Sequence, residues 1–538
     1  MTNLSRTLIL GCSVLALSAC GPEEIVSPGT GGNVTINNIT NNPAPTPTPT
    51  PTPTTALVTA AFGCPVIPDQ DNATAGDQGL VDEGTITGPE GTWRVCAMPA
   101  RFIRSASLTR VPGLLYRLPG RVDVGTDGGP APDASDGLTD SLVTLTIAPG
   151  VIVYASGSAF LNVNRGSKIS AIGSATRPII FTSRDNVNGI NNADSSGQWG
   201  GIVLSGRAQL TDCQDANAPT GTVQCQRQVE GATDPALFGG ATNADNSGSL
   251  RFVQIRYSGF VLSGDAELQS LTTGGTGSGT VLDHIQSVNS SDDGVEFFGG
   301  NVNIKNLIVA GAEDDGLDMD VGAKLNIQYV LTAQRAGVGD STIESDTSRL
   351  GALDNLVPRT ATKISNATFI HRRTGDQVLR IRGGSDMNIA NSLVWDNSSA
   401  GTPCLRVDDA ATIQTAGDDE LGVPVFSSFG VQCATRTRNG SNSGATATAA
   451  DLYLTGGTGN NVSYVNTLTG GYLNGASENN FAPIFNATTF SSFFVATTFI
   501  GAVTSTDNWT QGWTCDSAAV SFGGNTGSCL ALPVFPAS

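Results

Sequence analysis

The sequence predicts an all-β protein whose strands wind into a solenoid of stacked coils, the architecture of a parallel β-helix. The chain of 538 residues contains 66 glycines and only 14% charged residues. Long segments with helical periodicity are missing, and short apolar segments alternate with turns instead. A repeat of about 22 residues is the third observation, and it distinguishes a solenoid from a sandwich.

The expected strands of the first coils follow one another without a helix between them. Each is rich in β-branched or aromatic residues and is bounded by turn-forming residues. This pattern alone is compatible with a β-sandwich or a β-solenoid. The expected strands are Leu142–Ile147, Val151–Tyr154, Phe160–Val163, Lys168–Ile172, Pro178–Thr182 and Trp199–Leu204.

The spacing of a repeated turn decides in favour of the solenoid. The turn Ser291–Gly294 recurs as Glu313–Gly316 after 22 residues, and Ile285 keeps the same phase as Leu307. One coil of a parallel β-helix, with three short strands, needs a repeat of this length. A further step of 22 residues predicts that Leu307 stacks on Tyr329.

A second pair of similar segments lies further along the chain. Ile364–Phe369 resembles Ile389–Val394 at an offset of 25 residues. Stacking of these two segments would place Asn366 over Asn391. The sequence therefore predicts an internal ladder of asparagines.

Changes in composition divide the chain into five parts. Residues 1–20 form a targeting signal, and residues 21–60 form a disordered tether that ends in Pro-Thr repeats. Such repeats favour an extended stalk of roughly 3.1 Å per residue. Residues 61–140 are expected to be an irregular cap region, residues 141–410 the β-helix, and residues 411–538 the last coils with an aromatic cap over the open core.

The targeting signal ends in a motif for lipid attachment. Arg6 precedes the apolar stretch Leu8–Leu17, which is too short to span a bilayer. The following Leu17–Cys20 resembles the lipobox of bacterial lipoproteins, which implies that Cys20 is lipidated and starts the mature chain. By the same resemblance, Gly21 after the cysteine implies sorting to the outer membrane. A lipid would then anchor the protein in the cell envelope.

The cysteines agree with export to an oxidising compartment. The chain has 10 cysteines, of which one lies in the signal and one in the lipobox. The other eight fall into four sequential neighbours, and an even count favours disulfides. We predict the pairs Cys64–Cys96, Cys213–Cys225, Cys404–Cys433 and Cys515–Cys529.

Several segments between residues 140 and 515 are similar to a widespread family of exported bacterial proteins. Leu145–Gly150, Pro178–Ser183 and Trp199–Leu204 carry this likeness, as do Ser291–Gly300 and Phe499–Val503. The resemblance implies a right-handed parallel β-helix. It implies little about function, because that family is largely uncharacterised.

The two acidic turns form the most distinctive candidate site. Successive coils lie about 4.8 Å apart, so the offset of 22 residues stacks the carboxylates of one turn on those of the next. Like charges this close need compensation. Three outcomes relieve it: Ca²⁺ binds, one carboxyl keeps its proton as a general acid, or the side chains turn into water. The candidate metal ligands are Asp292, Asp293, Asp314, Asp315, Glu296 and Asp318.

A catalytic interpretation rests on a weaker resemblance. The two Asp-Asp-Gly turns followed by Arg380-Ile381-Arg382 resemble the layout of polygalacturonase-type glycosidases. That likeness implies an acid and base role for Asp293, Asp314 and Asp315. The Gly-His-Gly segment of that family is missing, because Arg335–Val338 stands in its place.

A basic cluster stands out in this acidic chain. Arg372, Arg373, Arg380 and Arg382 are candidates for binding an anionic sugar or a partner protein. The alternative interpretation is that they pair with the acidic column inside the molecule.

The function that we predict is binding without catalysis. The net charge of −19 argues against nucleic acid as a partner, and two histidines make a zinc site improbable. We expect a lipid-anchored β-helix at the outer membrane that binds a polysaccharide or an outer-membrane protein, with Ca²⁺ as the one candidate cofactor. The alternatives are a hydrolase or lyase acting on uronate polymers, and a surface protein that assembles with its own copies.

Overall fold

The computed structural model describes residues 58–70, 79–132, 142–230, 232, 235–263, 266–348 and 355–536. The predicted signal, the lipidation site at Cys20 and the tether up to residue 57 lie outside these residues. Within them, no helix is both long and apolar enough to cross a membrane. Val58 is buried and pairs with Gly91, so the folded domain starts slightly before the predicted end of the tether at residue 60.

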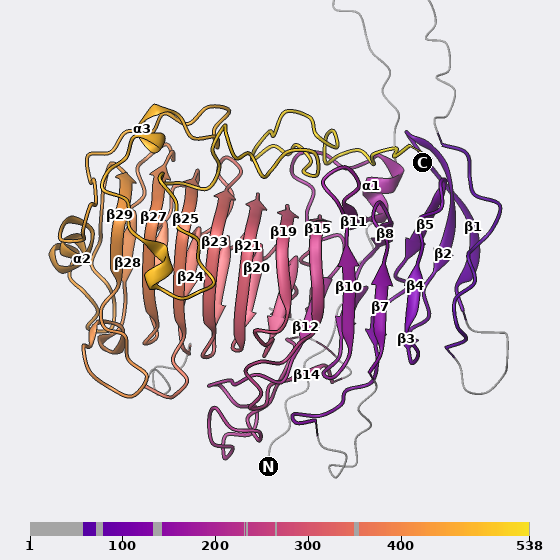
Figure 1. Cartoon of the computed structure of the whole chain (residues 1–538), viewed down its shortest axis with the longest axis horizontal. Helices are drawn as coiled ribbons and strands as arrows, with labels where there is room; N and C mark the ends of the chain where they lie inside the picture. Colours follow the sequence, from indigo (N-terminus) through magenta and orange to yellow (C-terminus); the bar gives the residue numbers. More distant parts are fainter. Residues whose placement is uncertain are drawn as a thin grey trace, which may run out of the picture. The chain divides into compact units, whose positions relative to one another are not determined.

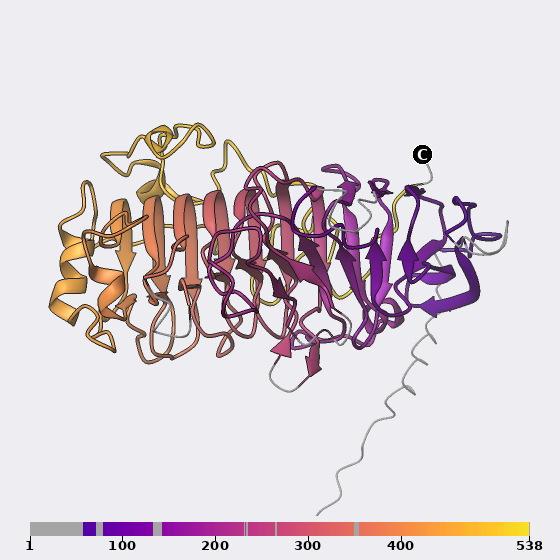
Figure 2. The ribbon, with the colours of Figure 1, turned by 90° about the horizontal axis from the view of Figure 1, so that it is seen from below.

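Two parallel sheets form the walls of the predicted β-helix, and most coils add a strand to each (Figures 1 and 2). The sheet with the long strands, which we call the long sheet, extends through the whole described domain. Its long strands are β15 (Gly248–Arg256), β19 (Val281–Val288), β21 (Asn301–Ala310), β23 (Lys324–Ala333), β25 (Ala361–His371), β27 (Asp386–Asp396) and β29 (Val425–Gln432).

The second sheet is built from short strands that follow each coil's turn. Its strands, in spatial order, are β3 (Arg101–Phe102), β6 (Val122–Val124), β9 (Phe160–Val163), β12 (Gly201–Ser205), β18 (Leu271–Gly274), β20 (Val295–Phe298), β22 (Leu317–Asp320), β24 (Ile343–Ser345), β26 (Leu379–Ile381) and β28 (Leu405–Val407). Short hairpins branch off between the coils: β13 (Arg227–Gln228) with β14 (Leu237–Phe238), and β16 (Val261–Ser263) with β17 (Ala266–Glu267).

Each long strand bends in its middle and so supplies two of the three walls of its coil. β10 (Lys168–Ile172) pairs with the first half of β15, and β11 (Ile179–Ser183) pairs with the second half. Two strands of one coil therefore become one bent strand in the next. The bend residue has a left-handed φ between 49° and 64° in seven successive coils. These residues are Phe252, His284, Asn306, Tyr329, Asn366, Asn391 and Ser428.

The bend divides the outer face of the long sheet into two chemically different halves. Before the bend, outward positions are polar, such as Asn303 and Asn326. After the bend several of them are apolar, such as Ile308, Leu331 and Ile370, and these side chains are fully buried. The inward positions of both halves join the central core. The second half therefore needs a cover, which the C-terminal part of the chain supplies.

The coils begin earlier than the sequence predicts. β2 (Gly91–Ala97) pairs in parallel with β5 (Leu114–Arg117), and β5 pairs with β8 (Ile152–Ala155). The prediction of an irregular region over residues 61–140 is therefore wrong. The remaining strands of this part are β1 (Val81–Gly88), β4 (Ala106–Leu108) and β7 (Thr144–Ile147). A short helix, α1 (Arg184–Asn188), also lies where we expected none.

The predicted register holds for the first repeat and slips by one residue in the second. Ile285 pairs with Leu307 and Ile364 pairs with Ile389, as predicted. Leu307, however, pairs with Val330 rather than with Tyr329. The cause is the connection between β22 and β23, Val321–Ala323, which is one residue longer than Gly299–Gly300 in the preceding coil.

All four predicted disulfides are present. Their Cα–Cα distances lie between 4.8 and 6.0 Å. Cys213–Cys225 closes the long connection between β12 and β15, and Cys515–Cys529 closes a loop near the C-terminus. The pairs are Cys64–Cys96, Cys213–Cys225, Cys404–Cys433 and Cys515–Cys529.

The last coil is closed by a helix rather than by aromatic residues. After the 3₁₀ turn Ala410–Ile413 and β29, α2 (Ala447–Thr455) packs Ala450 and Leu454 onto the open core. Figure 2 shows α2 at this end of the stack of coils. The prediction that the C-terminal aromatic residues cap the last coil is therefore wrong.

The aromatic residues belong instead to a segment that we call the strap, residues 456–536. The strap contains α3 (Ala476–Asn479) and a 3₁₀ turn, Ala487–Thr489, and returns along the bends towards the first coils (Figure 1). It covers the apolar outer half of the long sheet with Ala502, Val503 and Trp513.

Side-chain amides at the bends hold the strap in place. Gln286, Gln328 and Asn391 each donate to a strap carbonyl and accept from the backbone N–H of the same strap residue, at 2.8–3.0 Å. Asn366 donates to the carbonyl of Phe499 at 3.1 Å. The predicted asparagine stack thus exists, but its amides bind the strap.

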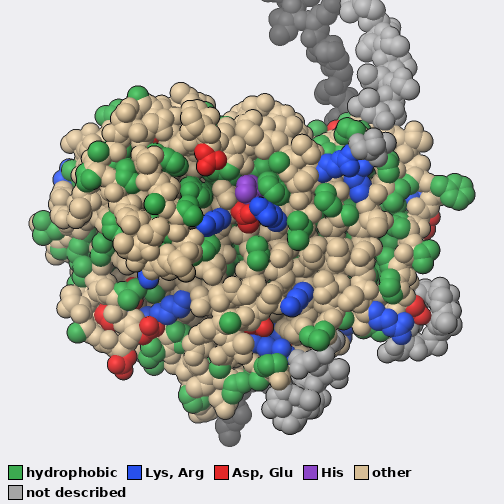
Figure 3. All heavy atoms as spheres, in the orientation of Figure 1, with side chains coloured by type: hydrophobic (Ala, Val, Ile, Leu, Met, Phe, Trp, Pro, Cys, Tyr) green, Lys and Arg blue, Asp and Glu red, His purple; other side chains and the backbone are tan. Residues whose placement is uncertain are grey.

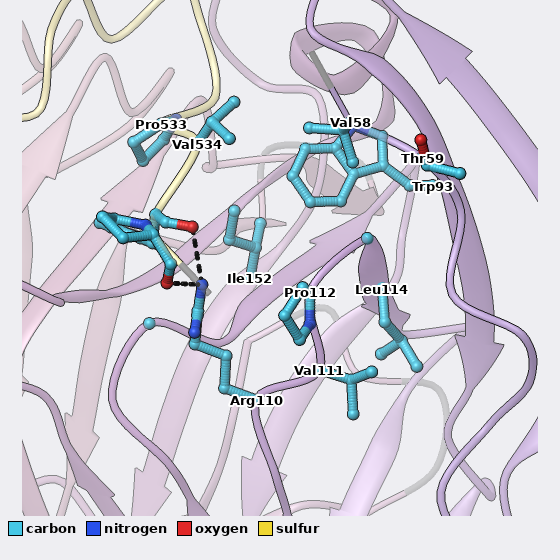
Figure 4. A pocket seen from close by; sticks show the side chains of 14 residues that line it. Val58, Thr59, Trp93, Arg110, Val111, Pro112, Leu114, Ile152, Pro533 and Val534 are labelled. Carbon is cyan, nitrogen blue, oxygen red and sulfur yellow. Dashed lines mark hydrogen bonds between the residues drawn. The ribbon is translucent and has the colours of Figure 1, made fainter. Parts of the chain in front are cut away.

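The end of the strap lies on the first coils (Figure 4). Arg110 donates to the carbonyls of Phe535 and Pro536 at 2.8 and 2.6 Å. An apolar cavity of about 440 Å³ beside this contact is lined by Val58 and Trp93 among others. The lining comes from both the strap and the first coils, and its one charged side chain, Arg110, already binds the strap. We therefore assign the cavity to the contact between strap and coils.

Candidate functional site

The two acidic turns stack on each other at the junction between the long sheet and the second sheet. Asp293 Oδ1 accepts a hydrogen bond from the backbone N–H of Asp315 at 2.9 Å, and Asp315 Oδ1 accepts one from that of Ser341 at 2.6 Å. A Cβ on Gly294 would lie 2.2 Å from the Val309 side chain, so the turn requires glycine. Asp293 and Asp315 therefore each fasten the turn of the following coil.

A column of charged side chains follows on the outer side of the second sheet. Glu296 pairs with Asp318, Asp318 with Glu344, Glu344 with Arg380, and Arg380 with Arg406. Because side chains alternate across a strand, the neighbouring positions Leu317 and Met319 point into the core. The column therefore changes from acidic to basic along the stack of coils.

A second charged column runs beside the first, two residues further along each strand. Asp320, Asp346, Arg382 and Asp408 occupy it. The first column is acidic at β20–β24 and has arginines at β26 and β28, whereas the second has Phe298 at β20 and an arginine only beside β26.

The carboxylates of these columns are buried although they face outward. The connection between β12 and β15, stapled by Cys213–Cys225, covers the adjacent outer face of the second sheet with Leu210 and Phe238, which pack on Phe298. Glu296 and Asp318 are each 3% exposed. The site is therefore a partly dry strip, in which charges are more costly than in water.

Burial changes the protonation of the acidic end. Burial raises the pKa of Asp293, Asp315 and Asp318 well above the usual range, and neighbouring carboxylates raise it further. Burial also raises the pKa of Glu344, although Arg382 and Arg380 act in the opposite direction. The acidic end therefore has a need for protons or cations, which Arg380 and Arg382 reduce at Glu344.

The two arginines of β26 pair with carboxylates of the same strip. Arg380 contacts Glu344 and Asp408, both at 3.1 Å. Arg382 contacts Glu344 at 2.7 Å and Asp346 at 2.9 Å. These contacts correspond to the alternative interpretation of the basic cluster, in which the arginines pair within the molecule.

The other two arginines of the predicted cluster bind different parts of the chain. Arg372 donates to the carbonyls of Gln334 and Ala519, at 2.7 and 2.5 Å. Arg373 pairs with Asp340 at 3.1 Å. The structure thus separates the four predicted ligand-binding arginines into two pairs with different partners.

Three overlapping groups of carboxylates have the spacing that a cation needs. In each group one oxygen per residue lies within 4.8 Å of the others. Ca²⁺ coordinates oxygen at about 2.3–2.6 Å, so two ligands of one ion lie at most about 5 Å apart. The groups are Asp292, Asp293 and Asp314; Asp293, Glu296 and Asp318; and Asp314, Asp315 and Asp340. All six predicted ligands belong to these groups.

Sequence reasoning missed several members of the strip. Glu344, Asp346, Arg406 and Asp408 lie beyond the regular repeats, where the offset between paired residues grows to 26 and then 36 residues, as from Asp318 to Glu344 to Arg380. The signal that could have found some of them is a charged residue between two apolar ones, as in Leu379-Arg380-Ile381 and Leu405-Arg406-Val407.

Comparison with known proteins agrees with this architecture. The model of a family described as a pectate-lyase-like β-helix domain matches residues 136–514, more than half of the chain. Neither a curated protein nor a solved structure matches the sequence. The chain therefore belongs to the family of pectate-lyase-like β-helix domains.

Proposed function

We propose that this protein is a lipid-anchored component of the cell envelope whose β-helix binds a polymer without cleaving it. The anchor is Cys20 in its lipobox, and the location is the outer membrane. The polymer is a polysaccharide, for which a stack of coils offers a long and rigid face.

One observation carries the non-catalytic part of the proposal: two of the three carboxylates suited to catalysis, Asp293 and Asp315, are engaged in structure, whereas the third, Asp314, is exposed. Asp293 and Asp315 are each 4% exposed, and each accepts a backbone hydrogen bond that fastens the next turn. Arg380 and Arg382, the candidates for holding a substrate carboxylate, pair with Glu344, Asp346 and Asp408. A general acid must reach the substrate, and these side chains face each other instead.

Calcium is the second part of the proposal. The groups centred on Asp293 consist of hard oxygen ligands, which Ca²⁺ prefers over the ligands that zinc takes. An ion there would neutralise the buried carboxylates of neighbouring coils and so stabilise the stack. In this account the metal serves the fold and takes no part in a reaction.

Affinity electrophoresis tests the binding. We expect the protein to migrate more slowly in native gels that contain an acidic polysaccharide than in gels without one. Migration that none of a panel of acidic and neutral polysaccharides changes would contradict the proposed function. Serum albumin in the neighbouring lane controls for sieving by the polymer.

A second candidate function is cleavage of uronate polymers by a hydrolase or lyase. Two observations favour it: membership of a pectate-lyase-like family, and buried carboxyls whose raised pKa suits a general acid. Binding and cleavage differ in one measurable property, the length of the polymer after incubation.

A further inference from the structure

The outer face of the long sheet before the bends is a second surface, separate from the charged columns of the second sheet. Its strands alternate between inward apolar residues and outward polar ones, as in Val302-Asn303-Ile304-Lys305. One outward column passes through Ser170, Ser249, Val281, Asn303, Asn326, Lys363 and Asn388. The next column passes through Ile172, Arg251, Asp283 and Lys305.

The charges on this face are mainly basic, although the whole chain has a net charge of −19. Lys305 and Lys363 form no ion pair among the residues that the structure describes. Arg251 is 50% exposed and shares Asp283 with His284. Figure 3 shows basic side chains on both sides of an acidic group and a histidine near the centre of this face.

Aromatic rings of the strap line one edge of the same face. The ammonium of Lys305 lies 4.7 Å from the centre of the Phe493 ring, and Lys363 donates to the carbonyl of Phe490 at 3.2 Å. Arg251 lies over Phe252, whose ring packs at a tilt against His284, with 4.2 Å between the ring centres. Arg251 and Lys305 are thus placed next to an aromatic ring, and Lys363 is placed next to the backbone of the strap.

We propose that this face binds the acidic polysaccharide, with Arg251, Lys305 and Lys363 as the residues that contact its anionic groups. The inference rests on the proposed function. It adds which surface binds the polysaccharide and which charge the polysaccharide carries. Neutral amides, hydroxyls, cations and aromatic rings are the groups that recognise an acidic sugar, through hydrogen bonds, ion pairs and stacking.

The arrangement suits an extended chain that runs along the stack of coils. Arg251, Lys305 and Lys363 lie on β15, β21 and β25, so a cation recurs on every second coil, roughly every 10 Å. A polymer that carries anionic groups along its length would contact all three. The acidic end of the charged columns on the second sheet would repel the same polymer, whereas this face carries charge complementary to it.

The test compares a double variant with a charge-matched control. The variant is Lys305→Gln with Lys363→Gln, and the control is Arg436→Gln with Arg438→Gln, which removes two surface cations that pair with Asp451 and Asp376. Affinity electrophoresis uses polygalacturonate, dextran sulfate and neutral dextran as three separate probes. Thermal melting of each variant verifies that the fold is intact.

We expect the double variant to bind the acidic probes at least tenfold more weakly than the wild type, and the control to bind as the wild type does. Binding to polygalacturonate alone identifies carboxylates as the anionic groups, and binding to dextran sulfate as well extends the ligand to sulfated sugars. Equal binding of the double variant and the wild type overturns the assignment of this face but leaves the proposed function standing. Wild-type binding to neutral dextran alone overturns the charge assignment, and no binding of the wild type to any probe removes the proposed function itself.

Discussion

Replacing Trp513 by alanine is expected to lower the free energy of unfolding by about 3–5 kcal/mol, the usual effect of removing a buried tryptophan. Trp513 is fully buried in the cluster that joins the strap to the apolar half of the long sheet. Its indole N–H donates to the carbonyl of Trp509 at 2.8 Å, and its ring meets Phe252 and His284 edge to face. Unfolding in denaturant measures the change, followed by far-ultraviolet circular dichroism because this signal comes mainly from the backbone.

The control for this experiment is Phe62→Ala, because Phe62 is fully exposed on the described surface. We expect its stability to stay within about 0.5 kcal/mol of the wild type. If the stability of Trp513→Ala also stayed within that range, the packing of the strap on the long sheet would contribute little to the free energy of unfolding. The account of the strap as the cover of the long sheet would then be wrong.

Replacing Asp318 by asparagine is expected to stabilise the calcium-free protein at pH 8, by on the order of 1–3 kcal/mol. Burial raises the pKa of Asp318, Asp293 and Asp315, so the folded protein holds these protons more tightly than the unfolded chain does. The free energy of unfolding of the wild type should therefore fall as the pH rises above the ordinary Asp pKa of about 3.9. Asparagine removes the charge that causes part of this loss.

Thermal melting at pH 4.5 and pH 8, each with and without Ca²⁺, measures this effect. We expect the advantage of Asp318→Asn to shrink at pH 4.5, where the wild-type carboxyls are protonated. At pH 8 calcium should raise the melting temperature of the wild type and should affect the variant less. The control is Asp418→Asn, whose side chain is exposed. A calcium response that is equal in the wild type and in Asp318→Asn would argue against the assigned ligands.

The repeat was predictable because its residues recur at a regular spacing, and the disulfides were predictable because they join cysteines that are neighbours in the sequence. An offset of 22 residues sufficed to stack Asp293 on Asp315 and Ile285 on Leu307. The prediction failed at Tyr329, where one additional residue in Val321–Ala323 shifts the register. A surface connection between strands tolerates such an insertion without a change in the strand pattern, so the sequence contains no signal for it.

The strap was not predictable, because its packing depends on contacts distant in sequence and without a period. Trp513 packs near Phe252, and Cys515 binds Gln286, more than 200 residues earlier in the chain. The aromatic residues of residues 490–513 therefore looked like a local cap. A sequence signal did exist: outward positions after the bends, such as Ile308 and Leu331, are apolar and require a cover.

The acidic end of the candidate site and the arginines Arg380 and Arg382 were predictable, but the partners of these arginines were not. Asp292 and Asp314 lie in repeated turns, whereas Glu344 and Arg380 are separated by 36 residues that include a long connection. Stacking of coils depends on strand pairing, and connections of different length can join the paired strands. Glu344 and Arg380 therefore meet although the connection between them is long.

The central claim, binding without cleavage, is tested most directly by the length of the polymer. Polygalacturonate is incubated overnight with an equimolar amount of the protein, with and without Ca²⁺, and its size distribution is measured by size-exclusion chromatography with light scattering. The account predicts an unchanged distribution under conditions in which the protein retains the polymer in affinity gels. A progressive shift to shorter chains, lost in Asp293→Asn and Asp315→Asn, would contradict it and would make the protein an enzyme.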